Sequence, residues 1–132
     1  KPGNHIMQPQ EISEKVITEG LVKLGLLDGD PEELHKSGAY KEFYMHKIGH
    51  WLGLDVHDAG DYVEGEEYMT FKPGMITTIE PGIYISSSMD IDDKWKGIGI
   101  RIEDDILVTK EGNENLTKKV PSDPEEIESL MS

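Results

Sequence analysis

The sequence predicts an α+β fold, because one stretch with helical periodicity precedes two stretches with the character of strands. Residues 9–24 carry apolar side chains at three- to five-residue spacing, as one side of a helix does. Residues 75–79 form an apolar, β-rich run, and residues 98–102 alternate between isoleucine and other residues. The chain of 132 residues is long enough for one domain with a core, since roughly two-thirds of the unfolded surface is buried at this size.

The N-terminal helix is expected to begin at Pro9, because proline fits the first turn of a helix, and to end near Gly25, a residue typical of helix C-termini. Its apolar side is predicted to consist of Ile12, Val16, Ile17, Leu21 and Leu24. Residues 32–36 follow Pro31 and precede Gly38, and they are compatible with either a loop or a short helix.

Two strands are expected in the second half of the chain. The first, residues 75–79, follows the turn signal at residues 72–74 and stops at Pro81. The second contains three alternating isoleucines, which we expect in the core: Ile98, Ile100 and Ile102. The same alternation places Arg101 and Glu103 together on the other face.

Three further segments have weaker patterns. Residues 40–61 follow neither period, and Gly49 within them indicates close backbone packing rather than a helix. Residues 106–109 are compatible with a continuation of the second strand or with its hairpin partner. Asp123 and Pro124 have the character of an N-cap and a first helical residue, which predicts a short C-terminal helix.

The net charge of the chain excludes some classes of binding partner. Thirteen Lys and Arg residues against 27 Asp and Glu residues give a net charge of −14, which would repel a nucleic-acid backbone or an anionic membrane. No apolar run approaches the roughly 20 residues of a membrane span. The absence of cysteine excludes disulfide and thiolate chemistry and agrees with a reducing cytoplasm. We therefore expect a cytoplasmic protein without nucleic-acid or membrane partners.

Three histidines and two glutamates stand out against glycine-rich, apolar surroundings, which is typical of a buried polar site. They are His46, His50, His57, Glu80 and Glu103. His46 and His50 have the spacing of a zinc-protease motif, but Lys47 takes the place of its catalytic glutamate. The residues alone leave open whether the histidines bind metal or are core residues bonded to the backbone.

The two glutamates also have ordinary explanations. Glu80 precedes Pro81, which keeps its backbone extended and lets the carboxylate point from a strand end, although such an acid is often a plain surface residue. Arg101 and Glu103 would lie on one face of a strand, about 7 Å apart at their Cα atoms. That spacing is compatible with a functional site or with a simple surface ion pair.

Three blocks occur in an order that is highly specific: His46-x-x-x-His50-x-x-Gly53-x-x-x-His57, then Glu80-Pro-Gly, then Arg101-x-Glu103. Together they resemble the C-terminal half of the pita-bread metallopeptidases, and within that family the Xaa-Pro aminopeptidases. The resemblance extends from about Phe43 to Thr117. It implies half of a pita-bread fold, with helices packed on one face of a curved antiparallel sheet.

The resemblance also implies the roles of the site residues. Two divalent metal ions, usually manganese in this family, would be bound by His50, Glu80 and Glu103, with Glu103 bridging both ions. A hydroxide held by the ions would cleave the bond between an N-terminal residue and a following proline, with Glu80 moving the proton. The other implied catalytic residues contact substrate or orient a neighbouring acid: His46, His57 and Arg101. No other cofactor is implied.

Residues 1–132 as a whole are expected to be the C-terminal half of a catalytic domain, because the family's two metal-binding aspartates and a further histidine belong to an earlier half. The isolated chain should therefore be inactive, and its uncovered face should make it a homo-oligomer. Two alternatives remain open. One is a prolidase, which cleaves Xaa-Pro dipeptides, and the other is a catalytically silent binding module of the same fold.

Overall fold

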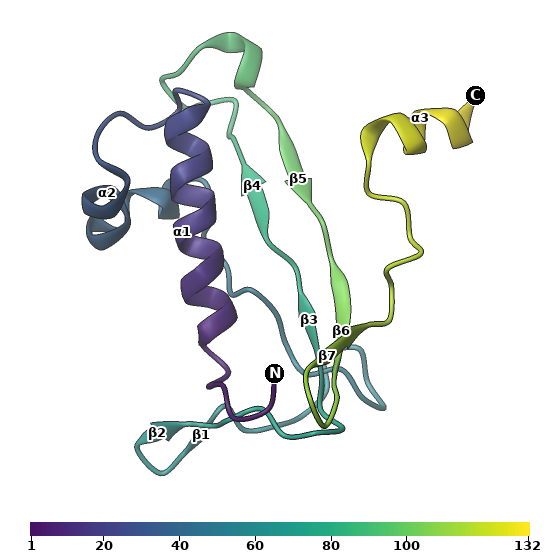
Figure 1. Ribbon diagram of the computed structural model, residues 1–132. Helices are drawn as coiled ribbons and strands as arrows, with labels where there is room; N and C mark the ends of the chain where they lie inside the picture. The colour runs from purple at the N-terminus through teal and green to yellow at the C-terminus, as the bar shows by residue number, and fades with distance from the viewer.

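A computed structural model describes all 132 residues, and the long helix α1 lies beside an extended ribbon of strands (Figure 1). The helices are α1 (Gln8–Lys23), α2 (Pro31–Ser37) and α3 (Pro124–Met131), with short 3-10 helices η1 (Ala39–Glu42) and η2 (Asp93–Trp95). The strands are β1 (Val63–Glu64), β2 (Glu67–Tyr68), β3 (Ile76–Ile79), β4 (Gly82–Tyr84), β5 (Gly99–Arg101), β6 (Asp104–Val108) and β7 (Asn113–Asn115). All strand pairs are antiparallel, so the α+β prediction is confirmed.

The helix α1 starts and ends where the sequence predicts. Pro9 occupies its first turn, and Gly25 follows the helix in the left-handed conformation (φ 72°) that glycine adopts without strain. Of the five apolar residues assigned to its inner side, only Ile17 and Leu21 are buried. The other three are exposed: Ile12, Val16 and Leu24. The helix thus meets the rest of the chain through a narrower face than its pattern indicates.

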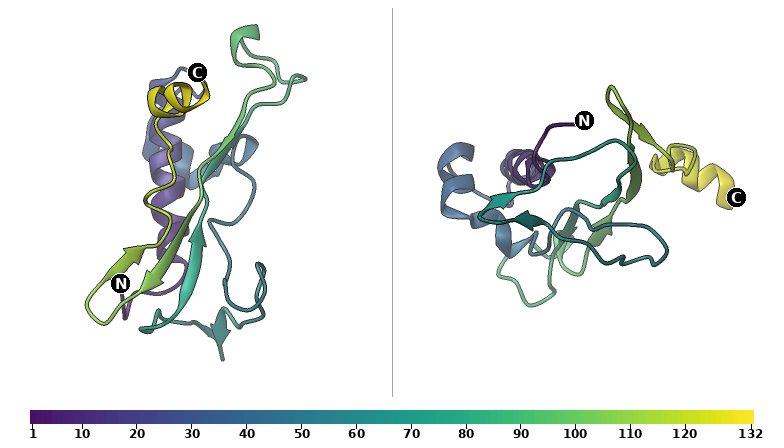
Figure 2. Two further views of the ribbon diagram at one scale, coloured as in Figure 1. Left: turned by 90° about the vertical axis from the view of Figure 1, so that its right-hand side faces the viewer. Right: turned by 90° about the horizontal axis from the view of Figure 1, so that it is seen from below.

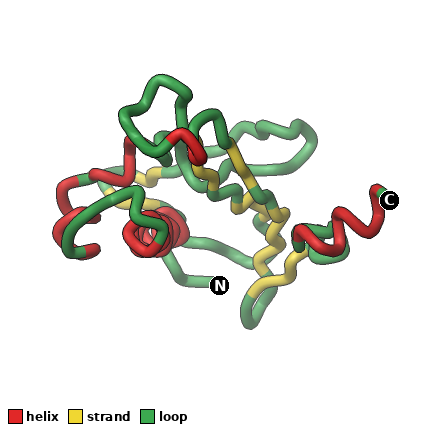
Figure 3. Tube along the Cα trace, turned by 90° about the horizontal axis from the view of Figure 1, so that it is seen from above, coloured by secondary structure: helices red, strands yellow, loops and turns green.

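The segment after α1 is a helix rather than a loop. The Asp30 side chain accepts hydrogen bonds from the N–H groups of Glu32 and Glu33, and Gly38 closes α2 in the left-handed conformation. Asp123 caps α3 in the same way, as predicted. The right-hand view of Figure 2 and Figure 3 show α3 away from α1 and α2, and no residue of α3 is buried. None of the helices is long and apolar enough to cross a membrane.

The second half of the chain forms a long antiparallel ribbon. The outgoing strand runs through β3 and β4, and the returning strand runs through β5 and β6. β3 pairs with β6 and β4 with β5, but Pro81 separates the two pairings because it has no N–H to donate. Across this break, the Ile102 N–H donates to the Pro81 carbonyl (3.3 Å). Residues 106–108 continue the returning strand as part of β6.

The segment that carries His46, His50 and His57, which we call the histidine-bearing segment, runs along the edge of β3 that is not paired with β6. Glu80 donates its N–H to the Ile48 carbonyl (2.7 Å), and Thr78 donates to the His50 carbonyl (3.0 Å), in antiparallel order. Gly49 lies between these bonds, and a Cβ atom there would be 1.9 Å from the Thr78 carbonyl oxygen. The close backbone packing predicted at Gly49 is therefore confirmed.

The predicted burial of three isoleucines is wrong, since Ile98, Ile100 and Ile102 are 36%, 59% and 48% exposed. Their alternation is correct, because all three line one apolar groove together with Ile83 and Ile85. We call this surface the isoleucine groove. The residues are exposed because no other element of this chain covers the groove.

Two hydrophobic clusters anchor the histidine-bearing segment at its two ends. The first joins α1 to the start of the segment and to the end of β4, and it contains Ile17, Leu21, Tyr40, Phe43, Tyr44 and Ile85. The second lies near the beginning of α1 and contains Ile6, Trp51, Phe71 and Val108. His46 and His50 lie between the two anchors, so packing on both sides fixes their backbone.

Candidate metal centre

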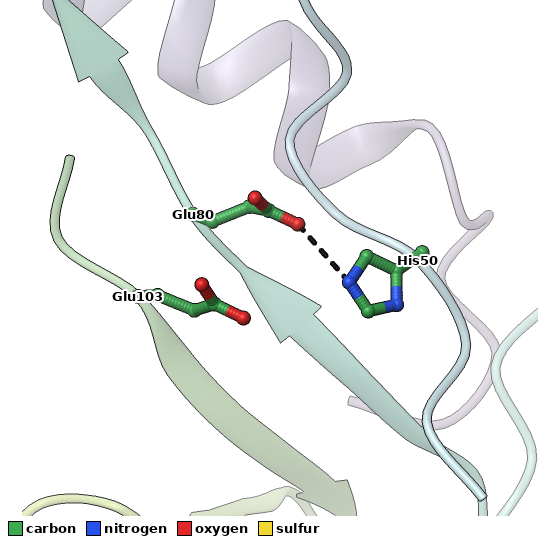
Figure 4. A group of neighbouring side chains, drawn as sticks. All are labelled: His50, Glu80 and Glu103. Carbon is green, nitrogen blue, oxygen red and sulfur yellow. Dashed lines mark ion pairs between the residues drawn. The ribbon is translucent and has the colours of Figure 1, made fainter. Parts of the chain in front are cut away.

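Three ligand-bearing side chains meet at the break in the ribbon (Figure 4). One ligand atom from each of His50, Glu80 and Glu103 lies within 4.8 Å of the other two. Glu80 directly follows β3, Glu103 precedes β6 on the returning strand, and His50 comes from the segment along the other edge. The structure thus brings together the three residues predicted as metal ligands, although they belong to three separate stretches of sequence.

The imidazole of His50 turns one ring nitrogen, Nε2, toward the carboxylate of Glu80. Its Nδ1 lies 2.9 Å from the Trp51 carbonyl oxygen, which only accepts hydrogen bonds, so Nδ1 carries the proton. The other ring nitrogen, Nε2, lies 3.4 Å from Oε1 of Glu80. The hydrogen bond to the backbone therefore orients the ring so that Nε2 faces the carboxylate.

Glu80 is the most deeply buried member of the cluster, with 8% of its surface exposed. An ionised carboxylate is stable in such a place only when it is paired or hydrogen-bonded. Its Oε1 accepts a hydrogen bond from the Thr78 hydroxyl (3.0 Å), and its Oε2 lies 3.4 Å from the Arg101 guanidinium. Each carboxylate oxygen thus has a partner of its own, which fixes the plane of the group.

The Tyr84 hydroxyl links Arg101 to His46. It accepts from Nε of Arg101 (2.6 Å) and is hydrogen-bonded to Nε2 of His46 (3.0 Å), whose Nδ1 donates to the Lys47 carbonyl. The Tyr84 oxygen, and then the nearby carboxylates, raise the pKa of Arg101 by stabilising its charged form. Burial raises the pKa of Tyr44, whose ring packs edge-on against His46 (4.9 Å). His46 is therefore connected to Glu80 by three contacts in series: His46 with Tyr84, Tyr84 with Arg101, and Arg101 with Glu80.

His57 lies on the solvent side of the cluster. Its side chain is exposed, and its ring packs edge-on against His50 with 4.4 Å between the ring centroids. All the residues predicted for the site are thus gathered around Glu80, with His46 and His57 in its outer part.

Two further residues, Thr78 and Tyr84, belong to the cluster and were not predicted from the sequence. Thr78 lies two positions before Glu80 on a strand, so the alternation of strand side chains was a signal for it. Tyr84 carried no such signal, because its contact with Arg101 depends on the pairing of Gly82 with Arg101 between β4 and β5.

The donor set fits divalent metal ions. Two carboxylates and one imidazole suit Mn²⁺, Fe²⁺, Co²⁺ or Zn²⁺, and the imidazole is oriented with Nε2 toward the carboxylates. Three donors are fewer than a pair of such ions requires, because even a tetrahedral ion takes four. A pair of ions at this place would need ligands from outside the cluster.

The family model of metallopeptidase family M24 matches residues 1–110. The chain belongs to this family. It is 48% identical over 131 residues to the Xaa-Pro aminopeptidase of Escherichia coli (strain K12), covering 99% of this chain and 30% of that protein. It is 49% identical over 131 residues to the Xaa-Pro aminopeptidase of Haemophilus influenzae, with the same coverage. Membership of this metallopeptidase family implies divalent metal ions.

Solved structures confirm the fold of this M24 chain. Aminopeptidase PepP of Pseudomonas aeruginosa superposes with a TM-score of 0.95 and 54% identity, covering 98% of this chain and 30% of that one. E. coli aminopeptidase P with the inhibitor Pro-Leu superposes with a TM-score of 0.91 and 48% identity, covering 99% of this chain and 30% of that one. The predicted pita-bread architecture is therefore correct, and the chain spans about 30% of the length of these relatives.

Proposed function

We propose that this M24 chain is the C-terminal half of a pita-bread catalytic domain in a metal-dependent aminopeptidase. The enzyme releases the N-terminal residue from peptides that have proline in the second position. The observation that carries the proposal is the meeting of His50, Glu80 and Glu103 within 4.8 Å at the break in the ribbon. The names of the relatives support the substrate class, since two are Xaa-Pro aminopeptidases and one solved structure of aminopeptidase P holds the inhibitor Pro-Leu.

His50, Glu80 and Glu103 are the proposed ligands of two divalent ions, with manganese as the proposed metal. Carboxylate oxygens with one imidazole suit Mn²⁺ well, although the same donors also accept iron, cobalt and zinc. When bound, such an ion pair supplies a water of lowered pKa and polarises the scissile carbonyl. Glu103 is the exposed member of the set and extends from the strand opposite Glu80. Its proposed role as the ligand that would bridge the two ions rests on the resemblance to the family.

The other residues act on protons, charge and substrate. Glu80 is the proposed proton carrier, because its buried carboxylate is held in place by Thr78 and Arg101. His57 is exposed beside His50 and is placed to contact a peptide that enters from solvent. His46, bonded to the Tyr84 hydroxyl, is placed to stabilise charge that develops on the substrate.

The isoleucine groove supports the assignment to half of a domain. Three of its apolar side chains, Ile98, Ile100 and Ile102, are exposed side by side, and exposed apolar surfaces of this kind mark an interface. In the intact domain the groove would be covered by the other half. We propose the cytoplasm as the location, in agreement with a chain that has no cysteine.

Metal dependence and proline selectivity test the proposed function together. The full-length protein, stripped of metal and resupplied with Mn²⁺, should release the N-terminal residue from a tripeptide with proline second, but not from the matching alanine peptide. Without Mn²⁺ the release should stop. Turnover of the Xaa-Pro dipeptide in preference to the tripeptide would favour a prolidase. No metal-dependent cleavage of either peptide would contradict the proposal.

The isolated chain of 132 residues should be inactive on the same tripeptide and should self-associate. Three ligands cannot complete the coordination of two ions, and an uncovered apolar groove tends to find a second copy. Sedimentation velocity should show a dimer or a larger homo-oligomer, and calorimetry should show weak Mn²⁺ binding or none. Measurable turnover by a pure monomer would contradict this expectation.

A further inference from the structure

The hydroxyl of Thr78 links two of the three proposed ligands. Thr78 is 1% exposed and lies in β3, two residues before Glu80 and therefore on the same side of the strand. Its Oγ1 lies 3.0 Å from the backbone nitrogen of His50 and 3.0 Å from Oε1 of Glu80. One buried atom thus contacts both the backbone that carries the imidazole and the carboxylate itself.

The direction of each hydrogen bond follows from the chemistry of the partners. The backbone N–H of His50 can only donate, so the hydroxyl accepts there. The ionised carboxylate of Glu80 can only accept, so the hydroxyl donates its single proton there. The two bonds are complementary, because accepting from one neighbour leaves the proton free for the other.

We propose that Thr78 is a positioning residue that fixes Glu80 and His50 relative to each other, so that both present their ligand atoms to the same ion. The inference rests on the proposed metal-binding function. Oε1 of Glu80 and Nε2 of His50 face each other across 3.4 Å, while Oε2 lies beside Arg101. The bond from Thr78 therefore determines which carboxylate oxygen faces the imidazole.

Valine is the informative replacement, because it keeps the branched shape of threonine and lacks the hydroxyl. Without the hydroxyl, the N–H of His50 loses its acceptor and Oε1 of Glu80 loses its donor. The carboxylate then keeps only its ion pair with Arg101, through Oε2, and can rotate away from His50. Because Thr78 is buried, no bulk water replaces the lost bonds.

Thr77 provides a matched control on the same strand. It is also buried, at 9% exposure, and its hydroxyl donates to the His50 carbonyl (3.0 Å). It makes no contact with the Glu80 side chain, since its side chain points to the opposite side of the strand. Thr77→Val therefore removes a buried hydroxyl that bonds the His50 backbone, but it leaves the bond from Thr78 to the Glu80 carboxylate in place.

The test is a calorimetric titration of the metal-free, full-length protein with Mn²⁺. Thr78→Val should raise the Kd for Mn²⁺ by about 10- to 100-fold, the usual effect of losing a group that orients a ligand. Thr78→Ser should restore most of the affinity, and Thr77→Val should bind as the wild type does. Circular dichroism checks that each metal-free variant is folded. If Thr78→Val does not fold, Thr78→Ala takes its place in the comparison with Thr78→Ser.

The outcomes separate this inference from the proposed function. If the wild type binds Mn²⁺ and Thr78→Val binds it equally well, the positioning role is wrong and the proposed function stands. A serine variant as weak as the valine variant, or an equal loss in Thr77→Val, also contradicts positioning by this hydroxyl. If the wild type itself binds no divalent ion, both the positioning role and the proposed function are wrong.

Discussion

Replacing Glu103 by alanine should abolish metal-dependent turnover in the full-length protein and remove most of its bound metal. Glu103 supplies one of only three ligand atoms that this chain brings within 4.8 Å. Its loss should cost more than the roughly 10- to 100-fold in metal affinity that is typical of a group behind a ligand. Metal content after dialysis and turnover of the proline tripeptide measure the two effects.

The exposure of Glu103 makes this substitution easy to interpret. Its side chain lies at the surface, so truncation should change the free energy of unfolding of the metal-free protein by no more than about 0.5 kcal/mol. Metal loss would then not be a consequence of unfolding. A Glu103→Ala variant that keeps both its metal content and its turnover would contradict the ligand assignment.

His57→Ala is the matched control for Glu103→Ala, because both residues are exposed and lie beside His50 or its carboxylate partner. Removing a residue that acts on the substrate, and on the charge that develops later in the reaction, should leave the metal in place and depress turnover. The expected pattern is therefore metal lost in the first variant and retained in the second. Loss of metal from His57→Ala as well would show that its role had been assigned wrongly.

The elements around the two glutamates could be predicted because their signals are local. Pro81 ends a β-rich run directly after Glu80, and the isoleucine alternation fixes the side of the strand on which Arg101 and Glu103 lie. The start of the C-terminal helix was equally local, since Asp123 acts as its N-cap within the same turn. Signals of this kind need no knowledge of what packs against the segment.

Burial could not be predicted in the same way, because it depends on partners elsewhere. The alternation of Ile98, Ile100 and Ile102 correctly indicates a shared apolar side, but not that this chain leaves the side uncovered. The extended pairing of residues 48–52 with β3 was also not predicted, since the segment has no strand periodicity. The contact of Tyr84 with Arg101 likewise depends on strand register, which is a property of two segments.

Gly49→Ala adds one methyl group, and it should destabilise the protein more than a methyl group added anywhere else in the site. The new Cβ atom would lie 1.9 Å from the carbonyl oxygen of Thr78 and 2.7 Å from its carbonyl carbon, so the obstacle is backbone rather than a mobile side chain. The backbone cannot move aside without loss of the bonds that pair Ile48 with Glu80 and His50 with Thr78, at 2.7 and 3.0 Å.

The expected loss is at least about 3 kcal/mol in the free energy of unfolding, the upper end of the cost of overpacking. Urea unfolding of the full-length protein measures it, and Mn²⁺ affinity should fall as well, because His50 is the next residue. Gly20→Ala is the control: no atom lies within 4 Å of a Cβ at that position in α1, and alanine should raise stability by up to about 1 kcal/mol. Wild-type stability in Gly49→Ala would mean that the segment and β3 are not held in this close pairing, and the convergence of His50 with Glu80 would lose its structural basis.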